Sequence, residues 1–380
     1  MAYPSVDQLQ KVLANGVFHY TKDPKKAAGR ALGTLVEIIT FYLLKSWGFE
    51  HSIAIERSLA EYGNPEITHN IEYTLHPILR QYPFVLSPPK LPTSATRILS
   101  ELKSQFALTD FQPSGMTLLT KEGVLRNSCL ITSQSKSYWI ATLNVKNQDE
   151  LRSMVTEQYV KPYAMFECKR VGVEEGTQKG PQTIEKAKQG AYVARAVSSL
   201  HKVRVASGEL RGLIYKADQT IYSKPYADLI AEISTSDDPE LLRDFVLTVG
   251  VVSNHGNWFT SNNHNKELKV LAQSYDWLTF LTDEGLSEFI TELLLNPVPL
   301  LEPAKVAFLV SYTAEKKKNR FTKVQMDYEA DRVLQTYFKA NAARIEGWFN
   351  IVSPGIGSMA QLRSQLAQLR DKNWSAIHEL

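Results

Sequence analysis

The sequence has little cysteine and no long apolar run. Two of its 380 residues are cysteines, Cys129 and Cys168, so it has neither a disulfide framework nor a Cys/His cluster with zinc-binding spacing. No segment reaches the roughly 18 apolar residues that a membrane span needs. Residues 1–10 lack the charged and then apolar pattern of a signal peptide. These absences predict a cytoplasmic protein with no membrane association and no structural zinc.

An excess of one charge sign is also missing. Lys and Arg number 43 against 40 Asp and Glu, which leaves a net charge of +3. That balance is too mild to indicate nucleic-acid binding by itself, so the positions of the basic residues matter more than their sum. With 43% apolar and 22% charged residues, the chain can bury the core of one large or two smaller domains.

The most informative segment that is present is the apolar run Tyr163–Val171, which contains one acid and one base. In a strand, Glu167 and Lys169 project from one face, while Phe166 and Cys168 project from the other. A carboxylate beside an ammonium at the rim of a sheet can hold a divalent cation and polarise a phosphate or a water. An ordinary ion pair on a solvated strand face is the alternative.

The apolar patterns predict a helix–sheet–helix organisation. We expect helices at 25–47, 95–106, 147–159 and 181–200, and strands at 116–119, 129–132, 138–145, 163–171, 210–215 and 245–252. Strands 129–132 and 138–145 would form a hairpin through the turn at 133–136. The helix at 147–159 is predicted from an Asn147…Glu150 spacing that is similar to a capping box.

The fold class we predict is α/β, with a central mixed β-sheet flanked by helices and a largely helical C-terminal region. Three parts are expected: a mainly helical part at 1–110 that contributes the core helix 25–47, a core at 111–281 with strand 163–171, and a helical region at 282–380. The last region would serve for dimer contacts or for clamping a ligand.

A Glu-x-Lys pair on a strand, preceded by a helix and a β-hairpin and followed by a basic helix, resembles the PD-(D/E)XK nuclease superfamily, in particular its type II restriction endonucleases. The resemblance covers about residues 25–255. It implies a restriction-endonuclease-like core that hydrolyses DNA with Mg²⁺. Glu167 would bind the metal together with the backbone carbonyl of Cys168, and Lys169 would orient or deprotonate the attacking water. The Cys168 side chain is expected to be buried.

The first metal-binding acid of that motif has no obvious counterpart, because the chain contains no Pro-Asp dipeptide. Asp149 and Glu150 stand at a suitable upstream spacing, with Asp149 as a metal ligand, although acids are also common in the first turn of a helix. Glu37 is the only carboxylate in the apolar helix 25–47. It is either a helical ligand or a residue of a solvated stripe.

DNA contacts are predicted in three segments. Lysines near a helix N-terminus suit phosphate contact, and asparagine and aromatic side chains suit contact with bases, although each segment also reads as an ordinary solvated surface or turn. The candidates are Lys179, Lys186, Lys188, Gln189 and Arg195 around the helix at 181–200; Asn254, His255, Asn257, Trp258, Asn262 and Asn263 in a polar loop; and Lys317 and Arg320 in a basic run.

The function predicted from these observations is Mg²⁺-dependent, site-specific cleavage of double-stranded DNA by a homodimer, because a palindromic site favours two-fold symmetry. Two alternatives stay open: a structure-selective repair or recombination nuclease that uses the same site, and a catalytically inactive DNA-binding module of the same fold.

Overall fold

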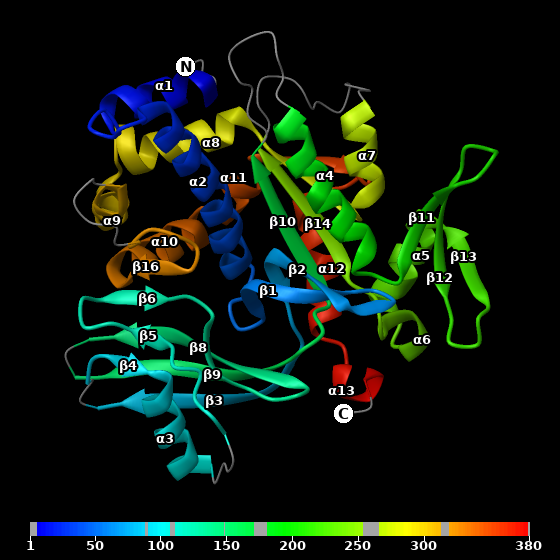
Figure 1. The fold of residues 1–380 in the computed structure, drawn as a ribbon, viewed down its shortest axis with the longest axis horizontal. Helices are drawn as coiled ribbons and strands as arrows, with labels where there is room; N and C mark the ends of the chain where they lie inside the picture. Colours follow the sequence, from blue (N-terminus) through cyan, green and yellow to red (C-terminus); the bar gives the residue numbers. More distant parts are fainter. Residues whose placement is uncertain are drawn as a thin grey trace.

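A mixed six-stranded β-sheet forms the centre of the computed structural model, which describes residues 6–87, 90–106, 111–147, 149–170, 181–253, 266–312 and 319–378 (Figure 1). The strands, in spatial order, are β1 (Ile53–Glu61), β2 (Asn64–Leu75), β10 (Ala164–Arg170), β14 (Leu247–Ser253), β15 (Trp277–Leu281) and β17 (Phe349–Ser353). β10, β14 and β15 are parallel, whereas β2 and β17 run antiparallel to their neighbours. The predicted α/β class with a mixed sheet is therefore confirmed.

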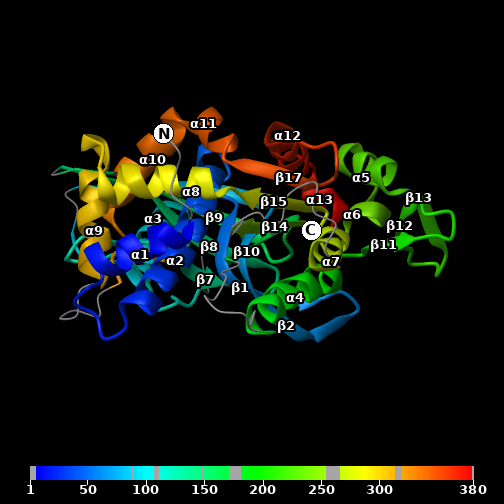
Figure 2. The ribbon, with the colours of Figure 1, turned by 90° about the horizontal axis from the view of Figure 1, so that it is seen from above.

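Helices cover both faces of this sheet (Figure 2). Along β10, Phe166 and Cys168 join a large core cluster with α2 (Pro24–Ser46), whereas Met165 joins a smaller cluster with α4 (Pro181–Ala196) and α7 (Lys266–Ser274). This alternation follows from the period-two geometry of a strand. The large cluster also takes buried residues from α1 (Val6–Gly16), α5 (Tyr226–Thr235), α6 (Pro239–Leu242), α8 (Asp283–Ile290), η1 (Thr291–Leu295), η2 (Pro299–Leu301), α9 (Glu302–Tyr312), α10 (Tyr328–Ala340), α11 (Ala342–Glu346), α12 (Met359–Arg370) and α13 (Trp374–Ile377).

Between β2 and β10 the chain leaves the central sheet and forms a separate layer, residues 78–159, which we call the β module (Figure 1). One of its sheets has the order β3-β9-β8-β7, and a second has the order β16-β6-β5-β4. The module has its own apolar cluster, which includes Phe84, Leu102, Trp139 and Val155. Its elements are β3 (Ile78–Leu86), β4 (Thr93–Ser94), α3 (Ala95–Phe106), β5 (Thr117–Leu119), β6 (Val124–Arg126), β7 (Cys129–Ser133), β8 (Ser137–Lys146) and β9 (Leu151–Tyr159).

Two further connections complete the fold. Strand β16 (Gln325–Asp327) comes from the C-terminal part of the chain and pairs with β6 of the β module, so it joins the module to the main body. A three-stranded antiparallel sheet projects on the other side of the molecule in Figure 1 and consists of β11 (Leu200–Arg204), β12 (Leu210–Tyr215) and β13 (Ile221–Pro225).

Many predicted elements are confirmed, including helix α2, the hairpin β7–β8 and strand β10. A mainly helical 1–110 segment was wrong, because residues 53–86 form the strands β1, β2 and β3. The overlooked signal is the alternation of Ile71, Tyr73 and Leu75 after a turn at Gly63, whose φ of 76° lies in the left-handed region that glycine tolerates.

The helix predicted at 147–159 is also wrong, since β9 occupies residues 151–159. The Asn147 side chain does not cap a helix. Its Oδ1 accepts hydrogen bonds from the backbone N–H groups of Asp149 and Glu150, which makes a tight turn between β8 and β9. Asparagine favours such turns as strongly as it favours helix starts, so the spacing alone could not distinguish them.

Among the described helices, α2 has the length and composition of a bilayer span. Two thirds of its most apolar window, 67%, is buried inside the protein, and a core helix passes the same test. The bent pair formed by Asp283–Leu295 and Pro299–Tyr312 passes only if it is taken as one span, with a 71° bend. These properties describe buried helices and do not by themselves indicate a membrane.

Candidate active site

Three glutamates occupy one row across three neighbouring strands of the central sheet. In the β1–β2 register Glu56 stands opposite Glu72. The β2–β10 ladder ends at the pair Tyr73 and Phe166, and one step further Glu72 stands beside Glu167. Adjacent strands lie about 4.8 Å apart, so the row brings together acids that are up to 111 residues apart in the sequence.

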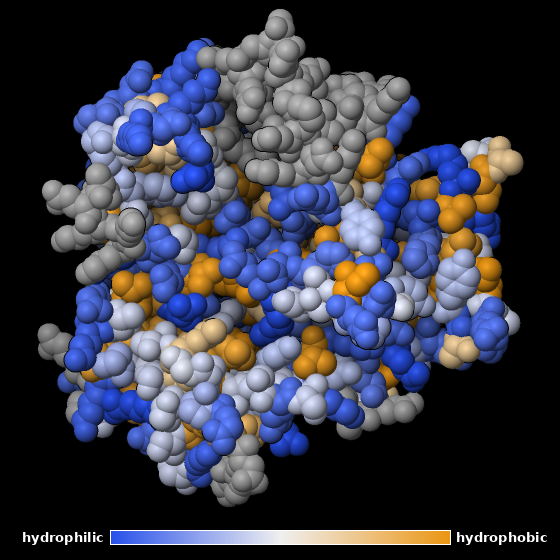
Figure 3. Space-filling view, viewed as in Figure 1, coloured by the Kyte–Doolittle hydropathy of each residue, from blue (hydrophilic) through white to orange (hydrophobic). Residues whose placement is uncertain are grey.

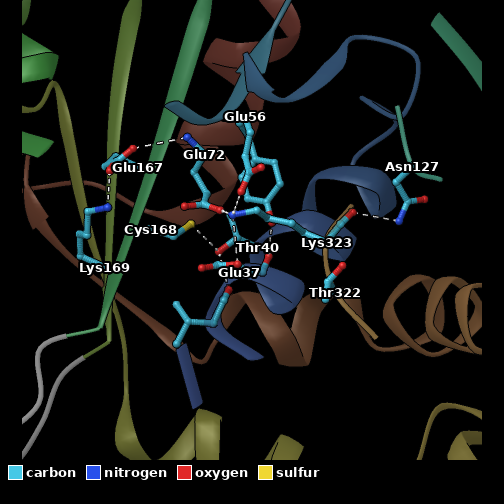
Figure 4. A network of polar contacts seen from close by, with 12 residues as sticks. Glu37, Thr40, Glu56, Glu72, Asn127, Glu167, Cys168, Lys169, Thr322 and Lys323 are labelled. Carbon is cyan, nitrogen blue, oxygen red and sulfur yellow. Dashed lines mark hydrogen bonds and ion pairs between the residues drawn. The ribbon is translucent and has the colours of Figure 1, made fainter. Parts of the chain in front are cut away.

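The end of the β2–β10 ladder explains how two of these acids interact. Beyond Phe166 the two strands stop pairing, so the N–H of Glu72 has no strand partner on this side. It donates a hydrogen bond to Oε2 of Glu167 at 3.4 Å instead (Figure 4). The Glu167 carboxylate therefore lies at the point where β2 separates from β10.

Glu167 and Lys169 form the predicted pair on one face of β10. Lys169 Nζ lies 2.5 Å from Oε1 of Glu167. Burial raises the pKa of Glu167, which is only 7% exposed, and the ammonium of Lys169 opposes that rise. The acid is partly desolvated, unlike the solvated surface pair that was the alternative interpretation.

The wall behind Glu167 is formed by α4 and the residue before β15. A Cβ placed on Gly190 of α4 would lie 2.5 Å from Oη of Tyr275 and 2.9 Å from Cγ of Glu167. Only glycine lets the helix come this close without moving either side chain. Burial raises the pKa of Tyr275, and the neighbouring Glu167 adds to that rise.

Cys168 faces the opposite side of the sheet, as predicted. Its thiol is buried and lies 3.5 Å from Oγ1 of Thr40 on α2. Burial raises the pKa of this thiol, which keeps it protonated. Cys168 is therefore a packing residue and not a nucleophile.

Glu37 on α2 reaches the same region through a buried lysine. Nζ of Lys323 lies 3.2 Å from Oε2 of Glu37, 3.0 Å from Oε1 of Glu56, and in contact with Oε1 of Glu72 (Figure 4). Burial raises the pKa of Glu37, and Lys323 and Lys169 both oppose that rise. Because both lysines act on Glu37, its carboxylate links the Lys323 cluster to the Glu167–Lys169 pair.

Glu56 adopts an unusual backbone conformation within this row. Its φ is 49°, in the left-handed region that a non-glycine residue rarely occupies. Such a conformation costs on the order of 1–3 kcal/mol and is common at functional sites. The strain coincides with the place where the acids gather.

The site contains four carboxylates, Glu37, Glu56, Glu72 and Glu167, against two ammonium groups. All the donors are oxygens of the type that Mg²⁺ prefers, and acids are in excess. In their present positions, no group of three or more His, Cys, Asp or Glu side chains among the described residues is arranged to hold a metal. The carboxylates instead contact the lysine ammonium groups.

Asp149 and Glu150 are not brought to this site. They lie in the turn between β8 and β9 of the β module, where Oε1 of Glu150 forms an ion pair with Nε of Arg152 at 2.9 Å. The acid that the sequence analysis missed is Glu72. Its signal is a single carboxylate in the alternating apolar segment Ile71–Leu75, which becomes visible only once that segment is recognised as a strand.

The predicted DNA contacts can be placed only in part. Gln189 and Arg195 are exposed on α4, and Gln189 adjoins Gly190 next to Glu167. Arg320 forms an ion pair with Asp327 at 3.8 Å. Figure 3 shows hydrophilic residues over much of the face between α4 and the β module. Outside the described residues or side chains lie Lys179, Lys186, Lys188, Asn254, His255, Asn257, Trp258, Asn262, Asn263 and Lys317.

Comparison with known proteins adds no relative to this description. No protein-family model matches the chain, no curated protein matches its sequence, and no solved structure matches its fold.

Proposed function

We propose that this chain is a Mg²⁺-dependent endonuclease that hydrolyses phosphodiester bonds in double-stranded DNA, of the type II restriction class. One observation carries the proposal: Glu72 stands beside Glu167 and Lys169, at the separation of β2 from β10. Glu72 supplies the acid that the Glu-x-Lys motif lacked when only the neighbouring sequence was considered.

The order of the elements supports the same proposal. The chain runs from helix α2 through the hairpin β1–β2 to the Glu-x-Lys strand β10 and then to helix α4. This is the order on which the resemblance to the PD-(D/E)XK superfamily rests. The hairpin of this order is β1–β2, while the hairpin expected from the sequence, β7–β8, belongs to the β module.

The residues have distinct roles in this proposal. Glu72 and Glu167, together with the carbonyl of Cys168, would hold Mg²⁺, which acts as a Lewis acid on the scissile phosphate when bound. Lys169 orients the attacking water and offsets the negative charge that grows on the phosphate. The water oxygen forms a bond to phosphorus, one bridging P–O bond breaks, and the leaving oxygen takes up a proton from solvent. Glu37 steadies the acid cluster from α2.

The experiment that tests this function is digestion of a long mixed-sequence duplex DNA with Mg²⁺ or with EDTA, followed by sequencing of the fragment ends. We expect discrete Mg²⁺-dependent fragments that share a short end motif. Glu72→Gln should remove cleavage, and Glu150→Gln, the matched change in the β module, should retain it. Equal cleavage by both variants would contradict the assignment of Glu72.

One observation favours a second candidate, an inactive DNA-binding module of this fold. The acids of the site already contact two lysines, which neutralise part of the charge that would attract a metal. For this alternative we expect DNA binding that is equal in Mg²⁺ and EDTA, with no fragments from unmodified or methylated DNA. Cleavage of branched DNA without a shared end motif would instead identify a structure-selective nuclease.

A further inference from the structure

Lys323 is a buried lysine whose ammonium lies among the carboxylates of the site. The residue is 8% exposed, and its Nζ contacts Glu37, Glu56 and Glu72, which come from α2, β1 and β2. Burying an ammonium is unfavourable unless opposite charges and hydrogen bonds surround it. Three carboxylates supply that environment, so Lys323 acts as a resident cation of the acid cluster.

The cation position that Lys323 fills overlaps the one a metal would need. The proposed function assigns Glu72 to the metal and Glu37 to its support, and both already contact the ammonium. A divalent ion that approaches Glu72 would be repelled by a positive charge at contact distance from the same oxygen atoms. Lys169 differs, because it contacts Glu167 alone among the acids of the site for which an ion pair is described.

Lys323 belongs to a short turn that is attached to the β module. Within the turn, the N–H of Thr322 donates to the carbonyl of Gln325, and Phe321 bridges to Met326. Outside it, the Asn127 side chain donates to the carbonyl of Lys323 at 3.1 Å, and the Asn127 N–H donates to the carbonyl of Val324 at 2.9 Å. β16 then pairs with β6. The β module therefore holds the lysine in place.

The attachment has space beside it. A cavity of about 180 Å³ is lined by Arg126, Asn127 and Ser128 of the β module and by Phe41 and Lys45 of α2. Interior packing is normally dense, so a cavity of this size beside Asn127 leaves room for the turn to shift. The junction between the module and the main body is thus the part of the site that can rearrange.

We propose that Lys323 is a tethered cation that competes with a divalent metal ion for Glu72 and Glu37, and that the β module sets the strength of this competition through Asn127. The inference rests on the metal site of the proposed function. It assigns Lys323 a positioning role, because the residue acts on the metal through the carboxylates. The metal binds fully only when the turn that carries Lys323 moves away from the acids.

The test measures metal affinity without DNA. Mn²⁺ binding to the full chain is followed by calorimetry for the wild type, Lys323→Met and Lys216→Met. Lys216 is the matched control, since it pairs with Glu240 far from the site. Losing a unit charge at contact distance should tighten Mn²⁺ binding to Lys323→Met by about tenfold or more. Lys216→Met should match the wild type. Unchanged or weaker binding to Lys323→Met overturns the proposal, as does the absence of Mn²⁺ binding from all variants.

Two more variants keep the test decisive if Lys323→Met does not fold. Lys323→Met with Glu56→Gln removes one charge of each sign, and it should still bind Mn²⁺ more tightly than Glu56→Gln alone. Asn127→Ala retains the ammonium but loosens the turn, so it should tighten binding by a smaller factor. A purely structural Lys323 would change none of these affinities. Tighter metal binding without any DNA cleavage would support the competition and reject the nuclease.

Discussion

The central sheet and the β module treat charge in opposite ways. In the central sheet, Glu167 and Lys323 are buried at 7% and 8% exposure and contact other charged groups. The interior of the β module is built from apolar side chains such as Phe84 and Trp139. Its acids at Asp149 and Glu150 stay in a surface turn. Buried charges lower stability unless they are well paired, so the central sheet gives up stability at one row of residues while the module does not.

That difference separates two kinds of residue in this molecule. A side chain in the row of Glu56, Glu72 and Glu167 should affect chemistry more than folding. A side chain in the apolar interior of the module should do the reverse. Backbone strain follows the same division, since Glu56 with its φ of 49° lies in the row. Variants in the two regions can therefore break or sharpen the contrast.

The largest effect is expected for Lys169→Ala. Loss of the group that orients the water should reduce the rate of DNA cleavage by about a hundred- to ten-thousand-fold. DNA affinity, measured by fluorescence anisotropy in Ca²⁺, should change little because other groups contact the phosphates. Lys136→Ala in the exposed β7–β8 turn is the matched control. Cleavage retained by Lys169→Ala would show that the pair on β10 is structural.

In the module, Trp139→Ala should have a comparable effect on stability. The Trp139 ring is 2% exposed and stacks on Tyr82 with ring centres 4.9 Å apart. Truncating a buried aromatic residue costs about 3–5 kcal/mol of the free energy of unfolding, which urea titration measures. Val85→Ala, at a site that is 48% exposed on β3, should cost less than about 0.5 kcal/mol. A small cost at Trp139 would mean that the module contributes little to global stability.

An intermediate effect is expected at Gly190, where folding and chemistry meet. The added methyl of Gly190→Ala would displace Tyr275 or Glu167, and such overpacking costs about 1–3 kcal/mol. Because Glu167 would move relative to Lys169, the cleavage rate should fall as well. Gly33→Ala in α2 meets no atom within 4 Å, so it should stabilise the helix by about 0.5–1 kcal/mol. If Gly190→Ala behaves like Gly33→Ala, α4 does not constrain the site.

The contrast also explains which parts of the site the sequence revealed. Glu167 and Lys169 are two residues apart, so strand periodicity alone placed them on one face. Helix α2, with Glu37, was predictable from its long apolar period and its end near Gly48. Interactions within one element are encoded in the spacing of neighbouring residues. For that reason the local half of the site could be predicted.

The rest of the site depends on contacts between distant segments. Glu72 meets Glu167 across 95 residues, because the whole β module is inserted between β2 and β10. Lys323 meets Glu72 only through the pairing of β16 with β6. Single-sequence patterns contain no signal for such pairings. The nearest upstream acids, Asp149 and Glu150, were therefore preferred to an acid on a strand that had been taken as helical.

The smallest effect is expected from pH at the contact of α13 with the β module. The His378 ring stacks on Trp374 at 5.5 Å and lies 4.4 Å from the Tyr159 ring. Burial lowers the pKa of His378 to about 4, with Lys161 and Arg243 acting in the same direction and Asp244 opposing them. The folded protein therefore favours neutral His378. Its contribution to stability is complete above the ordinary pKa near 6.5 and is lost as pH falls toward 4.

Urea unfolding at pH 7.5 and pH 5 measures this contribution. After allowance for the solvent that screens a half-buried ring, His378 should account for about 1 kcal/mol of the stability lost between the two pH values. His378→Phe keeps an aromatic ring that cannot be protonated, so it should lose less stability at pH 5 than the wild type. His19→Phe, at an exposed position, should follow the wild type. If His378→Phe also follows the wild type, the acid sensitivity of this contact arises from other groups, and the apolar character ascribed to the module would extend to its junction with α13.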